Sequence, residues 1–364
     1  MTAQRILICL HDFARGGTER IAIGLAGAWA AMGRDVTILC GATEGGLSDT
    51  IDARVKVVAL NPPIHRSALS RMRLGRAMSR HLAELQPDIV FLPGNFHLFL
   101  ARGLRRAAPR LPIVLKISNP PLPHGIVALP GRMVFQYFVR AINGFAALTS
   151  GFAREIAMLA PGKPAPVLHD PIYWHQSSQA RAMPDGVCNI LWAGRLEPQK
   201  DIGLALRAMS VLIRQRPSHL TILGDGSLRG ETDRMIGEMG LGAVVTRIGH
   251  VPSIDSWLAR ADVLLMTSHY EGQPAVVGEA LAHGIPVVST DCTDMLRDVI
   301  TIPEAGMVVA SRDPAALAGA LGQVCEAPRT SRERLAALVA PFEPQRCARA
   351  YLDFFDTMAA RRDA

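Results

Sequence analysis

Short apolar runs alternate with stretches of helical periodicity along the first part of the chain. The runs lack a regular apolar–polar alternation, which is typical of strands in a parallel sheet that helices cover on both faces. They predict strands at 6–10, 36–40, 55–60, 89–92, 113–117 and 144–149, and helices at 18–32, 66–85 and 134–143. This part of the sequence therefore predicts a doubly wound α/β domain.

A segment rich in proline and polar residues, 161–186, interrupts this pattern and indicates a domain boundary. The pattern then restarts, with strands expected at 190–193, 220–223, 244–248, 263–266, 286–289 and 307–309, and helices at 203–214, 231–239, around Glu279, and at 314–326, 332–338 and 344–360. We expect two facing Rossmann-like domains, 1–170 and 171–343, and a C-terminal helix in 344–364 that returns to the first domain. Ligands of such sheets bind beyond the carboxyl ends of the strands, here in the interdomain cleft.

Composition is that of a globular protein. Of the 364 residues 49% are hydrophobic and 20% are charged, and no run approaches the roughly 20 apolar residues that span a bilayer. The apolar run at 6–10 lacks the length and the cleavage site of a secretion signal. The six cysteines are scattered without a CxxC pair, which predicts buried free thiols in a reducing cytoplasm.

Positive charge is concentrated in the first half. Residues 1–170 hold 20 Lys and Arg against 10 Asp and Glu, a net charge of +10, and residues 171–364 hold 19 against 22, a net charge of −3. Few aromatic residues are present there to stack on bases, so an anionic membrane surface or a phosphate-bearing acceptor fits better than nucleic acid. Arginines recur through 66–82, which fits either a membrane-facing amphipathic helix or a solvated helix packed on its own domain. The apolar stretch 122–138 fits either a lipid-acceptor groove or a buried helix entry.

A diglycine, Gly16 and Gly17, lies between the first strand and the first helix. Glycine lets the backbone approach an anion closely, and the helix start directs free N–H groups at it. The segment lacks the GxGxxG spacing of dinucleotide-binding folds, and glycine pairs also occur at such turns for steric reasons.

Two cations, Arg195 and Lys200, flank a proline-containing loop that follows the first strand of the second domain. A guanidinium fork and an ammonium point charge at a strand end suit the two phosphates of a diphosphate. The alternative is a surface ion pair with Glu197 or Asp201.

The segment SHYEGQPAVVGEALAHGIPVVST, residues 268–290, combines two carboxylates with a helix start. Glu271 lies in a Gly/Pro loop, and Glu279 lies within an apolar helical run that stops at Gly284. Carboxylates so spaced address separate parts of one hydroxyl-rich ligand, and the helix start offers N–H groups to its oxygens. Alone, the pattern also fits an acidic loop residue and a surface glutamate. Two further turns, LGDG at 223–226 and IGHVP at 248–252, predict a positive-φ turn and a strand end whose backbone meets a flat base.

Taken in order, the segments GGTER, GRLEPQKD, LGDG, GHVP and EGQPAVVGEALAHGIPVVSTD resemble the retaining, nucleotide-sugar-dependent glycosyltransferases of family 4, which have the two-Rossmann GT-B fold. The resemblance is strong over 189–311 and the diglycine loop. It is thin over 41–170, where acceptor recognition varies between family members. Each motif is weak alone, but five in this order and spacing are highly specific.

The resemblance implies a role for each matched residue. Glu279 would hold the ribose hydroxyls, and Glu271 would contact donor-sugar hydroxyls near the reacting carbon. Arg195 and Lys200 would neutralise the leaving diphosphate. Backbone groups would complete the donor site: the amides of Gly16 and Gly17 at the diphosphate, the run Gly272, Gln273, Pro274 and Ala275 at the sugar, and Val251 beside the base.

Departures from the family pattern concern the first domain and the sugar. Family members usually carry a histidine at the end of a first-domain strand, where this chain reads KISNPPLPHG, so that role falls to Asn119 or His124. Gln273 follows EG where other members have an aromatic or small residue. The other histidines considered, His97, His169, His250, His269 and His283, have no metal-ligand spacing and are interpreted as structural.

We therefore expect a hexosyltransferase that moves a sugar from a nucleotide-diphosphate sugar to a hydroxyl of a saccharide or lipid-linked acceptor, in cell-surface polysaccharide or glycolipid biosynthesis. No metal or other cofactor is expected, because Arg195 and Lys200 supply the charge that a metal ion would supply. The expected location is the cytoplasm, with attachment to the inner face of the membrane as an open hypothesis. The alternatives are an epimerase or phosphorylase of the same fold, or a catalytically silent nucleotide-sugar-binding partner of a polysaccharide assembly complex.

Overall fold

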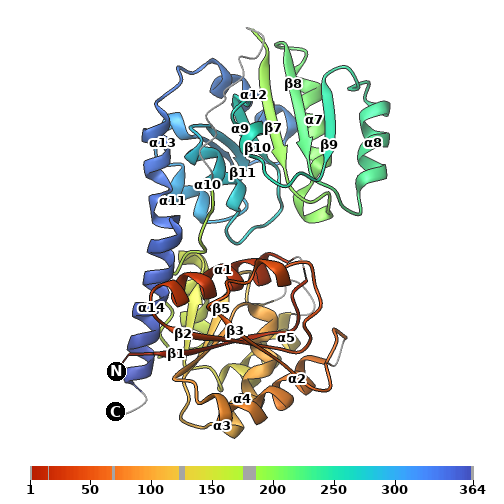
Figure 1. Ribbon diagram of the computed structural model, residues 1–364. Helices are drawn as coiled ribbons and strands as arrows, with labels where there is room; N and C mark the ends of the chain where they lie inside the picture. Colours follow the sequence, from red (N-terminus) through yellow and green to blue (C-terminus); the bar gives the residue numbers. More distant parts are fainter. Residues whose placement is uncertain (1, 15, 68–69, 123–127, 175–185, 362–364) are drawn as a thin grey trace. The chain divides into compact units, whose positions relative to one another are not determined.

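The computed structural model describes residues 2–14, 16–67, 70–122, 128–174 and 186–361. The chain divides into two compact units (Figure 1). Unit 1 comprises Met1–Pro171 and Phe342–Ala364, and unit 2 comprises Ile172–Pro341. The last segment of the chain therefore belongs to the unit formed by the first.

Unit 1 is built on a six-stranded sheet with the order β3-β2-β1-β4-β5-β6. Every neighbouring pair is parallel. Its strands are β1 (Arg5–Leu10), β2 (Asp35–Cys40), β3 (Lys56–Ala59), β4 (Ile89–Leu92), β5 (Ile113–Ile117) and β6 (Gly144–Ala147). Its helices are α1 (Gly17–Ala31), α2 (Ser70–Met78), α3 (Leu82–Leu85), α4 (Ala101–Ala107), α5 (Ala128–Val139), α6 (Ser150–Leu159) and α14 (Pro344–Ala360), with short 3-10 turns η1 (Ser48–Thr50), η2 (Ser79–His81) and η3 (Asn95–Leu100).

The apolar run at the start of the chain forms strand β1. Its residues are all apolar after Arg5 because both faces of the strand are buried. Ile6, Ile8 and Leu10 belong to the hydrophobic cluster that includes residues of α1 and α14. Leu7 and Cys9 face the cluster that includes residues of α2, α4 and α5. Successive side chains of a strand point to opposite faces, so only an uninterrupted apolar run fills both layers.

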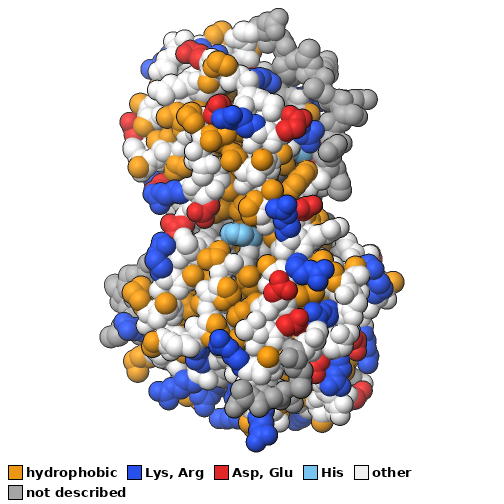
Figure 2. Space-filling view, turned by 90° about the vertical axis from the view of Figure 1, so that its left-hand side faces the viewer, with side chains coloured by type: hydrophobic (Ala, Val, Ile, Leu, Met, Phe, Trp, Pro, Cys, Tyr) orange, Lys and Arg blue, Asp and Glu red, His pale blue; other side chains and the backbone are white. Residues whose placement is uncertain are grey.

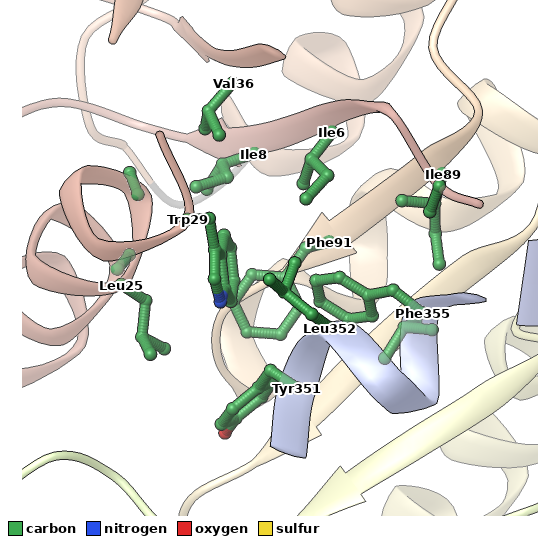
Figure 3. Close-up of a cluster of buried hydrophobic side chains, with 14 of the residues drawn as sticks. Ile6, Ile8, Leu25, Trp29, Val36, Ile89, Phe91, Tyr351, Leu352 and Phe355 are labelled. Carbon is green, nitrogen blue, oxygen red and sulfur yellow. The ribbon is translucent and has the colours of Figure 1, made fainter. Parts of the chain in front are cut away.

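Helix α14 completes the core of unit 1 with aromatic side chains (Figure 3). The ring of Phe355 lies 5.1 Å from that of Trp29 and 5.5 Å from that of Phe91, measured between centroids. Tyr351 packs on the same two rings at 5.9 and 5.6 Å. The Trp29–Phe355 and Phe91–Tyr351 pairs are edge-to-face, and such pairs contribute about 0.5–1.5 kcal/mol each beyond their burial, so α14 is an integral part of this core.

Unit 2 has a sheet of the same design, again six-stranded and parallel throughout, with the order β12-β11-β10-β7-β8-β9. Its strands are β7 (Cys188–Ala193), β8 (Ser218–Leu223), β9 (Val245–Gly249), β10 (Val263–Met266), β11 (Val287–Thr290) and β12 (Gly306–Val309). Its helices are α7 (Ile202–Leu212), α8 (Arg229–Glu238), α9 (Asp255–Leu258), α10 (Ala275–Ala282), α11 (Met295–Val299), α12 (Pro314–Glu326) and α13 (Arg332–Leu338), with 3-10 turns η5 (Pro198–Lys200), η6 (Pro303–Ala305) and η7 (Ala340–Phe342). The expected α/β class and parallel sheets are confirmed.

Several helices differ from the expectation. The arginine-rich helix expected at 66–85 begins at Ser70, passes through the 3-10 turn η2, and ends as α3. Arg66 is not helical, and its guanidinium binds the carboxylates of Asp12 and Glu19 at 2.5 Å each. The helix expected at 134–143 is α5, which begins earlier and ends at Val139. Helices α4 and α6 were not expected, because with 7 and 10 residues they are shorter than the window over which helical periodicity is recognised.

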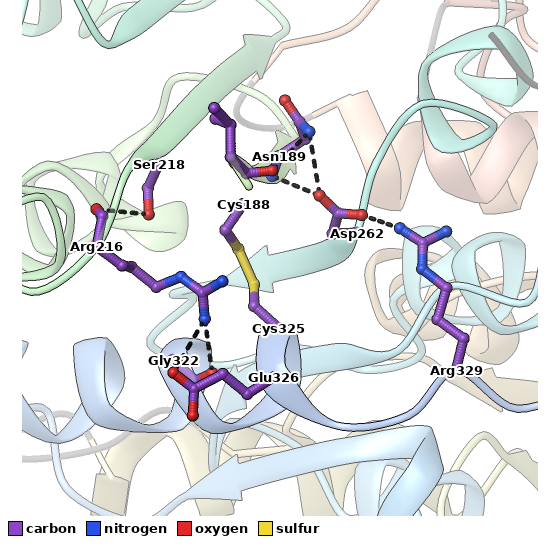
Figure 4. Close-up of a disulfide and its surroundings, with 10 residues drawn as sticks. Cys188, Asn189, Arg216, Ser218, Asp262, Gly322, Cys325, Glu326 and Arg329 are labelled. Carbon is purple, nitrogen blue, oxygen red and sulfur yellow. Dashed lines mark hydrogen bonds and ion pairs between the residues drawn. A yellow bond between two sulfur atoms is a disulfide. The ribbon is translucent and has the colours of Figure 1, made fainter. Parts of the chain in front are cut away.

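The expectation of free thiols is wrong for two cysteines. A disulfide joins Cys188, the first residue of β7, to Cys325 near the end of α12 (Figure 4). The two lie 137 residues apart in the sequence, with Cα atoms 6.1 Å apart, and spacing alone does not reveal such a pair. Cys9, Cys40, Cys292 and Cys347 are free.

We predict that Phe355→Ala destabilises unit 1 by about 3–5 kcal/mol, because it removes a buried ring from the centre of the aromatic cluster. Guanidinium titration followed by tryptophan fluorescence measures this, since Trp29 lies against Phe355. The control is Asp353→Ala on the exposed face of the same helix. Equal destabilisation by both variants would contradict the role given to the aromatic cluster.

Candidate active site

The candidate donor-site residues lie where the strand order of unit 2 changes direction. Strands β7 and β10 are neighbours, and the chain continues from them towards opposite edges of the sheet, through β8 and through β11. Ligands of doubly wound sheets bind at such a switch point, beyond the carboxyl ends of the strands. Arg195 and Lys200 follow β7 and Glu271 follows β10, so the topology brings both segments to this edge.

Lys200 and Glu271 form an ion pair at this position. The Lys200 Nζ atom donates to Glu271 Oε1 at 2.6 Å, and the two side chains are only 18% and 10% exposed. The alternative of an ion pair between Lys200 and Glu197 or Asp201 is therefore not what forms. A charge this far from water is costly without a partner, and here each group compensates the charge of the other.

Hydrogen bonds fix the backbone beneath the pair. Trp192 Nε1 donates to Thr267 Oγ1 at 3.1 Å, and this hydroxyl donates to the carbonyl of Lys200 at 2.9 Å. Gln199 Nε2 donates to the Tyr270 carbonyl at 2.8 Å, joining η5 to the loop after β10. The two loops that carry the pair are thus held together independently of it.

Asp201 and Arg312 form a second connection that the sequence did not reveal. Asp201 has a left-handed backbone (φ 43°) and caps α7 by accepting from the Leu204 N–H at 3.0 Å. Arg312, which follows β12, donates to Asp201 Oδ2 at 2.5 Å and to the carbonyls of Thr267 and Ser268, both at 2.9 Å. Its position 111 residues away in the sequence explains why no local motif indicates it.

The loop after Glu271 leads into α10, which carries Glu279. The Glu271 N–H donates to the Cys292 carbonyl at 2.9 Å, and Thr293 Oγ1 donates to the Gly272 carbonyl at 2.7 Å. Helix α10 follows Pro274 and has no side-chain cap, so its first N–H groups are directed at the space beyond the helix. Glu279 lies in the second turn and is partly exposed.

The LGDG turn has the structural role that its glycines predict. A Cβ atom at Gly224, where φ is +126°, would overlap the carbonyl oxygen of Gly194. A Cβ atom at Gly226 would overlap that of Leu196. The close approach lets Ser227 donate to the carboxylate of Glu197, through its N–H at 3.1 Å and its hydroxyl at 2.8 Å.

In unit 1, the diglycine lies at the start of α1, with Gly16 as the residue before the helix, but its surroundings are already occupied. The Gly16 N–H donates to the Ala14 carbonyl at 2.7 Å, and the Glu19 carboxylate folds back beside Gly16. Arg66 neutralises this carboxylate. Gly17 is the first residue of α1, and the N–H group at this position of a helix has no hydrogen-bond partner within the helix.

A pocket of about 130 Å³ lies at the corresponding switch point of unit 1, at the ends of β1, β4 and β5. His11, Asn95, His97 and Asn119 are among the residues that line it. Asn95 holds the end of β5: its Nδ2 donates to the Asn119 carbonyl at 2.9 Å, and its Oδ1 accepts from the Ser118 N–H at 2.9 Å. We name this space the hydroxyl pocket because it presents amide and imidazole groups.

The two histidines of the hydroxyl pocket are neutral at pH 7. Burial lowers the pKa of His97 to about 4, against an opposing interaction with the Gly94 backbone. Burial also lowers the pKa of His11. Neutral imidazoles donate and accept hydrogen bonds without carrying charge, which suits contact with hydroxyl groups.

The predicted residues thus fall into separate groups. Lys200 and Glu271 pair directly, Arg195 lies exposed on the loop between them and β7, and Asn119 lines the hydroxyl pocket. Val251 follows β9, at the edge of the sheet in unit 2. His124 lies outside the described residues. The sequence reasoning missed Asn95 and interpreted His97 as merely structural, since only the fold brings η3 next to Asn119.

We predict that Cys292 reports on the Lys200–Glu271 pair. The pKa of the Cys292 thiol is raised to about 11, mainly by burial and also by the Glu271 carboxylate, whereas Lys200 acts in the opposite direction. Glu271→Gln should therefore lower the pKa and speed iodoacetamide modification at pH 9, whereas Lys200→Met should slow it. Mass spectrometry of the Cys292 peptide measures both rates, with Cys347 in unit 1 as internal reference. Faster modification in both variants would indicate loop opening instead of a charge effect.

Comparison with protein families assigns both units. The model described as "Glycosyl transferases group 1" matches residues 188–327, and that described as "Glycosyl transferase 4-like domain" matches residues 16–169. The D-inositol 3-phosphate glycosyltransferase of Thermomonospora curvata is 30% identical over 174 residues. The aligned segment makes up 44% of this chain and 40% of that relative, so the chain spans less than half the length of the curated relative.

Solved structures share the fold over nearly the whole chain. The apo form of the lipopolysaccharide outer core galactosyltransferase WaaB superposes with a TM-score of 0.76 at 18% identity, covering 99% of this chain and 100% of that one. HepE from Anabaena, in complex with UDP and glucose, gives a TM-score of 0.72 at 17% identity and covers 99% of both chains. With matched models over both units and the GT-B fold throughout, this chain belongs to the group 1, or family 4, glycosyltransferases.

Proposed function

We propose that this protein is a retaining glycosyltransferase that transfers a sugar from a nucleotide-diphosphate sugar to an acceptor hydroxyl. The observation that carries the proposal is the Lys200–Glu271 pair at the switch point of unit 2, with Arg195 exposed on the same loop. A nucleoside diphosphate leaves readily only where fixed cations and dipoles meet its charge. The largely buried ammonium group of Lys200 supplies positive charge for the diphosphate, and the carboxylate of Glu271 beside it can accept hydrogen bonds from sugar hydroxyls.

In the proposed donor complex, Lys200 and Arg195 bind the diphosphate and Glu271 accepts hydrogen bonds from the sugar. Glu279 accepts from the two ribose hydroxyls, in the bidentate mode that a carboxylate allows. The first N–H groups of α10 face sugar oxygens. Before the donor arrives, Glu271 keeps Lys200 from being an unpaired cation at a largely buried position.

The proposed reaction takes the retaining course that the resemblance to family 4 implies. The acceptor oxygen forms a bond to the anomeric carbon on the face from which the diphosphate departs, and the bond from that carbon to the phosphate oxygen breaks. The acceptor proton passes to the departing phosphate oxygen, so no protein nucleophile is needed. Lys200 and Arg195 act on the charge that develops on the diphosphate, and because they supply the charge that a metal ion would supply, no metal ion is proposed.

A uridine nucleotide is the first donor to test, because HepE, which has the same fold, was solved with UDP. The acceptor is proposed to bind in unit 1 with its reacting hydroxyl in the hydroxyl pocket. Asn119 and the neutral His97 line that pocket.

The proposed acceptor is a saccharide, either free or linked to a lipid. We propose that the protein binds it at an anionic membrane surface. Basic side chains recur over the surface of unit 1, in the lower part of Figure 2. Helix α5 exposes Met133, Val134 and Tyr137, at 69%, 44% and 52% of their accessible surface. Among the described residues no helix has the length and apolarity to cross a bilayer, so any such contact is proposed to be peripheral.

The alternative enzymes are separated by their need for an acceptor. An epimerase would convert a nucleotide sugar without one, and a phosphorylase would release a sugar phosphate from phosphate and a saccharide. A catalytically silent partner would bind the donor without transfer or slow hydrolysis. Incubation with nucleotide sugars, with and without acceptor, distinguishes all three from a transferase.

We predict that UDP-sugars raise the melting temperature of the protein more than GDP-, ADP- and dTDP-sugars do at equal concentration. A ligand that binds only the native state stabilises it by mass action. A thermal-shift screen measures the effect, with UDP alone separating the base contribution from the sugar contribution. A larger shift with another base would reassign the donor, and no shift with any of the four would contradict donor binding.

We predict that Lys200→Ala lowers kcat by about 10²–10³-fold, as expected for loss of a group that stabilises developing charge. Glu279→Ala should instead raise the donor KM by roughly tenfold or more, because the ribose hydroxyls lose their hydrogen bonds to a charged carboxylate. Steady-state transfer assays separate the two effects. Glu238→Ala, an exposed carboxylate on α8, is the matched control. Wild-type kinetics in both site variants would disprove the assignment.

A further inference from the structure

A second pocket in unit 1, of about 430 Å³, lies between the segment that follows β3 and the face of α2 and η2. Its apolar wall includes Leu60 and Ala77, and its polar groups include Asn61 and Ser67. We name it the arginine pocket, because Arg73 of α2 and Arg80 of η2 are among the residues that line it. Its volume is enough for a phosphate ester together with part of the molecule that carries it.

Some arginines of unit 1 have a carboxylate partner, and several others, including Arg73 and Arg80, have none among the described residues. Arg5, Arg34, Arg54 and Arg66 each form an ion pair within unit 1. Neither Arg73 nor Arg80 makes an ion pair or side-chain hydrogen bond within the described residues, and the described lining of the pocket contains no Asp or Glu. A concave site with two uncompensated guanidinium groups attracts an anion.

Geometry favours a phosphate ester. The two arginines are seven residues apart on one side of a helical segment, so their Cα atoms lie about 10 Å apart along the axis. Each guanidinium presents a planar fork that matches phosphate oxygens, and long side chains from such positions converge on a phosphate or a diphosphate. His65 and His81 line the same pocket and lie 3.3 and 4.0 Å from the carboxylates of Glu44 and Glu84.

The arginine pocket adjoins the hydroxyl pocket. Ser67 lines both, and Leu74 and Arg71 of the hydroxyl pocket come from the same helix α2 as Arg73. The shared Ser67 places the two pockets next to each other on unit 1, so a site that suits an anion lies beside the hydroxyl pocket.

We propose that the arginine pocket binds a phosphate or diphosphate ester carried by the acceptor, with Arg73 and Arg80 as its ligands. This inference rests on the proposed transfer function, which it deepens by giving the acceptor an anionic group next to the hydroxyl that reacts. The phosphate belongs either to a soluble phosphorylated saccharide or to a membrane lipid, and both present the same chemistry to the two guanidinium groups.

The helix also supplies a matched control. Arg76 lies on α2 between Arg73 and Arg80 and is exposed, as they are, but it does not line either pocket. A general attraction of a basic helix to anions would treat all three arginines alike, with each contributing a similar amount near a charged surface. A built pocket requires Arg73 and Arg80 only.

The first experiment measures binding of pyrophosphate and of glycerol 3-phosphate to the full chain by isothermal calorimetry, with UDP present in saturating amount to occupy the donor site. We expect Arg73→Ala/Arg80→Ala to weaken binding at least tenfold and Arg76→Ala to change it less than twofold. Equal loss in the two variants, or unchanged binding in the double variant, would overturn the proposal. Circular dichroism and an unchanged thermal shift by UDP verify that the double variant is folded.

The second experiment identifies the source of the phosphate by flotation with vesicles of phosphatidylglycerol and phosphatidylcholine. Once the first experiment has shown pocket-dependent binding, loss of flotation in the double variant but not in Arg76→Ala assigns the phosphate to a lipid, and unchanged flotation assigns it to a soluble acceptor. Slow UDP-sugar hydrolysis without acceptor tests the proposed transfer function separately. If the arginine pocket does not bind phosphate but the protein is a glycosyltransferase, the hydrolysis is still observed. If the protein is not a glycosyltransferase, no hydrolysis is observed.

Discussion

Both units depend on one constraint: a parallel sheet has two apolar faces, and both must be covered. Consecutive strands run in the same direction only if the chain crosses back over a face of the sheet, and the crossing helices provide the cover. The same crossings bring every strand to its carboxyl end at a single edge. The hydrophobic requirement that makes the fold stable therefore also gathers the loops, and with them Lys200, Glu271 and the hydroxyl pocket, at one edge of each sheet.

Polar groups at these edges are held by local networks, each within its own unit. In unit 2 two hydrogen bonds fix the backbone of Lys200, which pairs with Glu271: the buried Trp192 indole donates to the Thr267 hydroxyl, and this hydroxyl donates to the Lys200 carbonyl. In unit 1 a fully buried pair, Lys116 with Asp170, lies just before the chain passes into unit 2, with Nζ–Oδ1 2.6 Å. Removing one partner of such a pair leaves an uncompensated buried charge, so these contacts fix geometry even where their net stabilisation is small.

How much the sequence predicted depends on the range of the interactions. The strands could be predicted because burial of both faces of a strand requires consecutive apolar residues, as in 6–10. Glu271 and Lys200 were recognisable because each follows a strand within a few residues. Arg312, Asn95 and the position of His97 in the lining of the hydroxyl pocket were not, because these positions are set by which strands are neighbours. The Cys188–Cys325 bond and the 3-10 break at η2 depend on tertiary packing in the same way.

The order of segments in unit 1 has a consequence for how the molecule is made. Helix α14 supplies Tyr351 and Phe355 to a core whose other rings, Trp29 and Phe91, are synthesised some 260 residues or more earlier. On a ribosome that core stays open while the whole of unit 2, a continuous stretch of chain, emerges and becomes free to fold. The unit begun first is thus finished last, and during synthesis its exposed aromatic face is the surface a chaperone would protect.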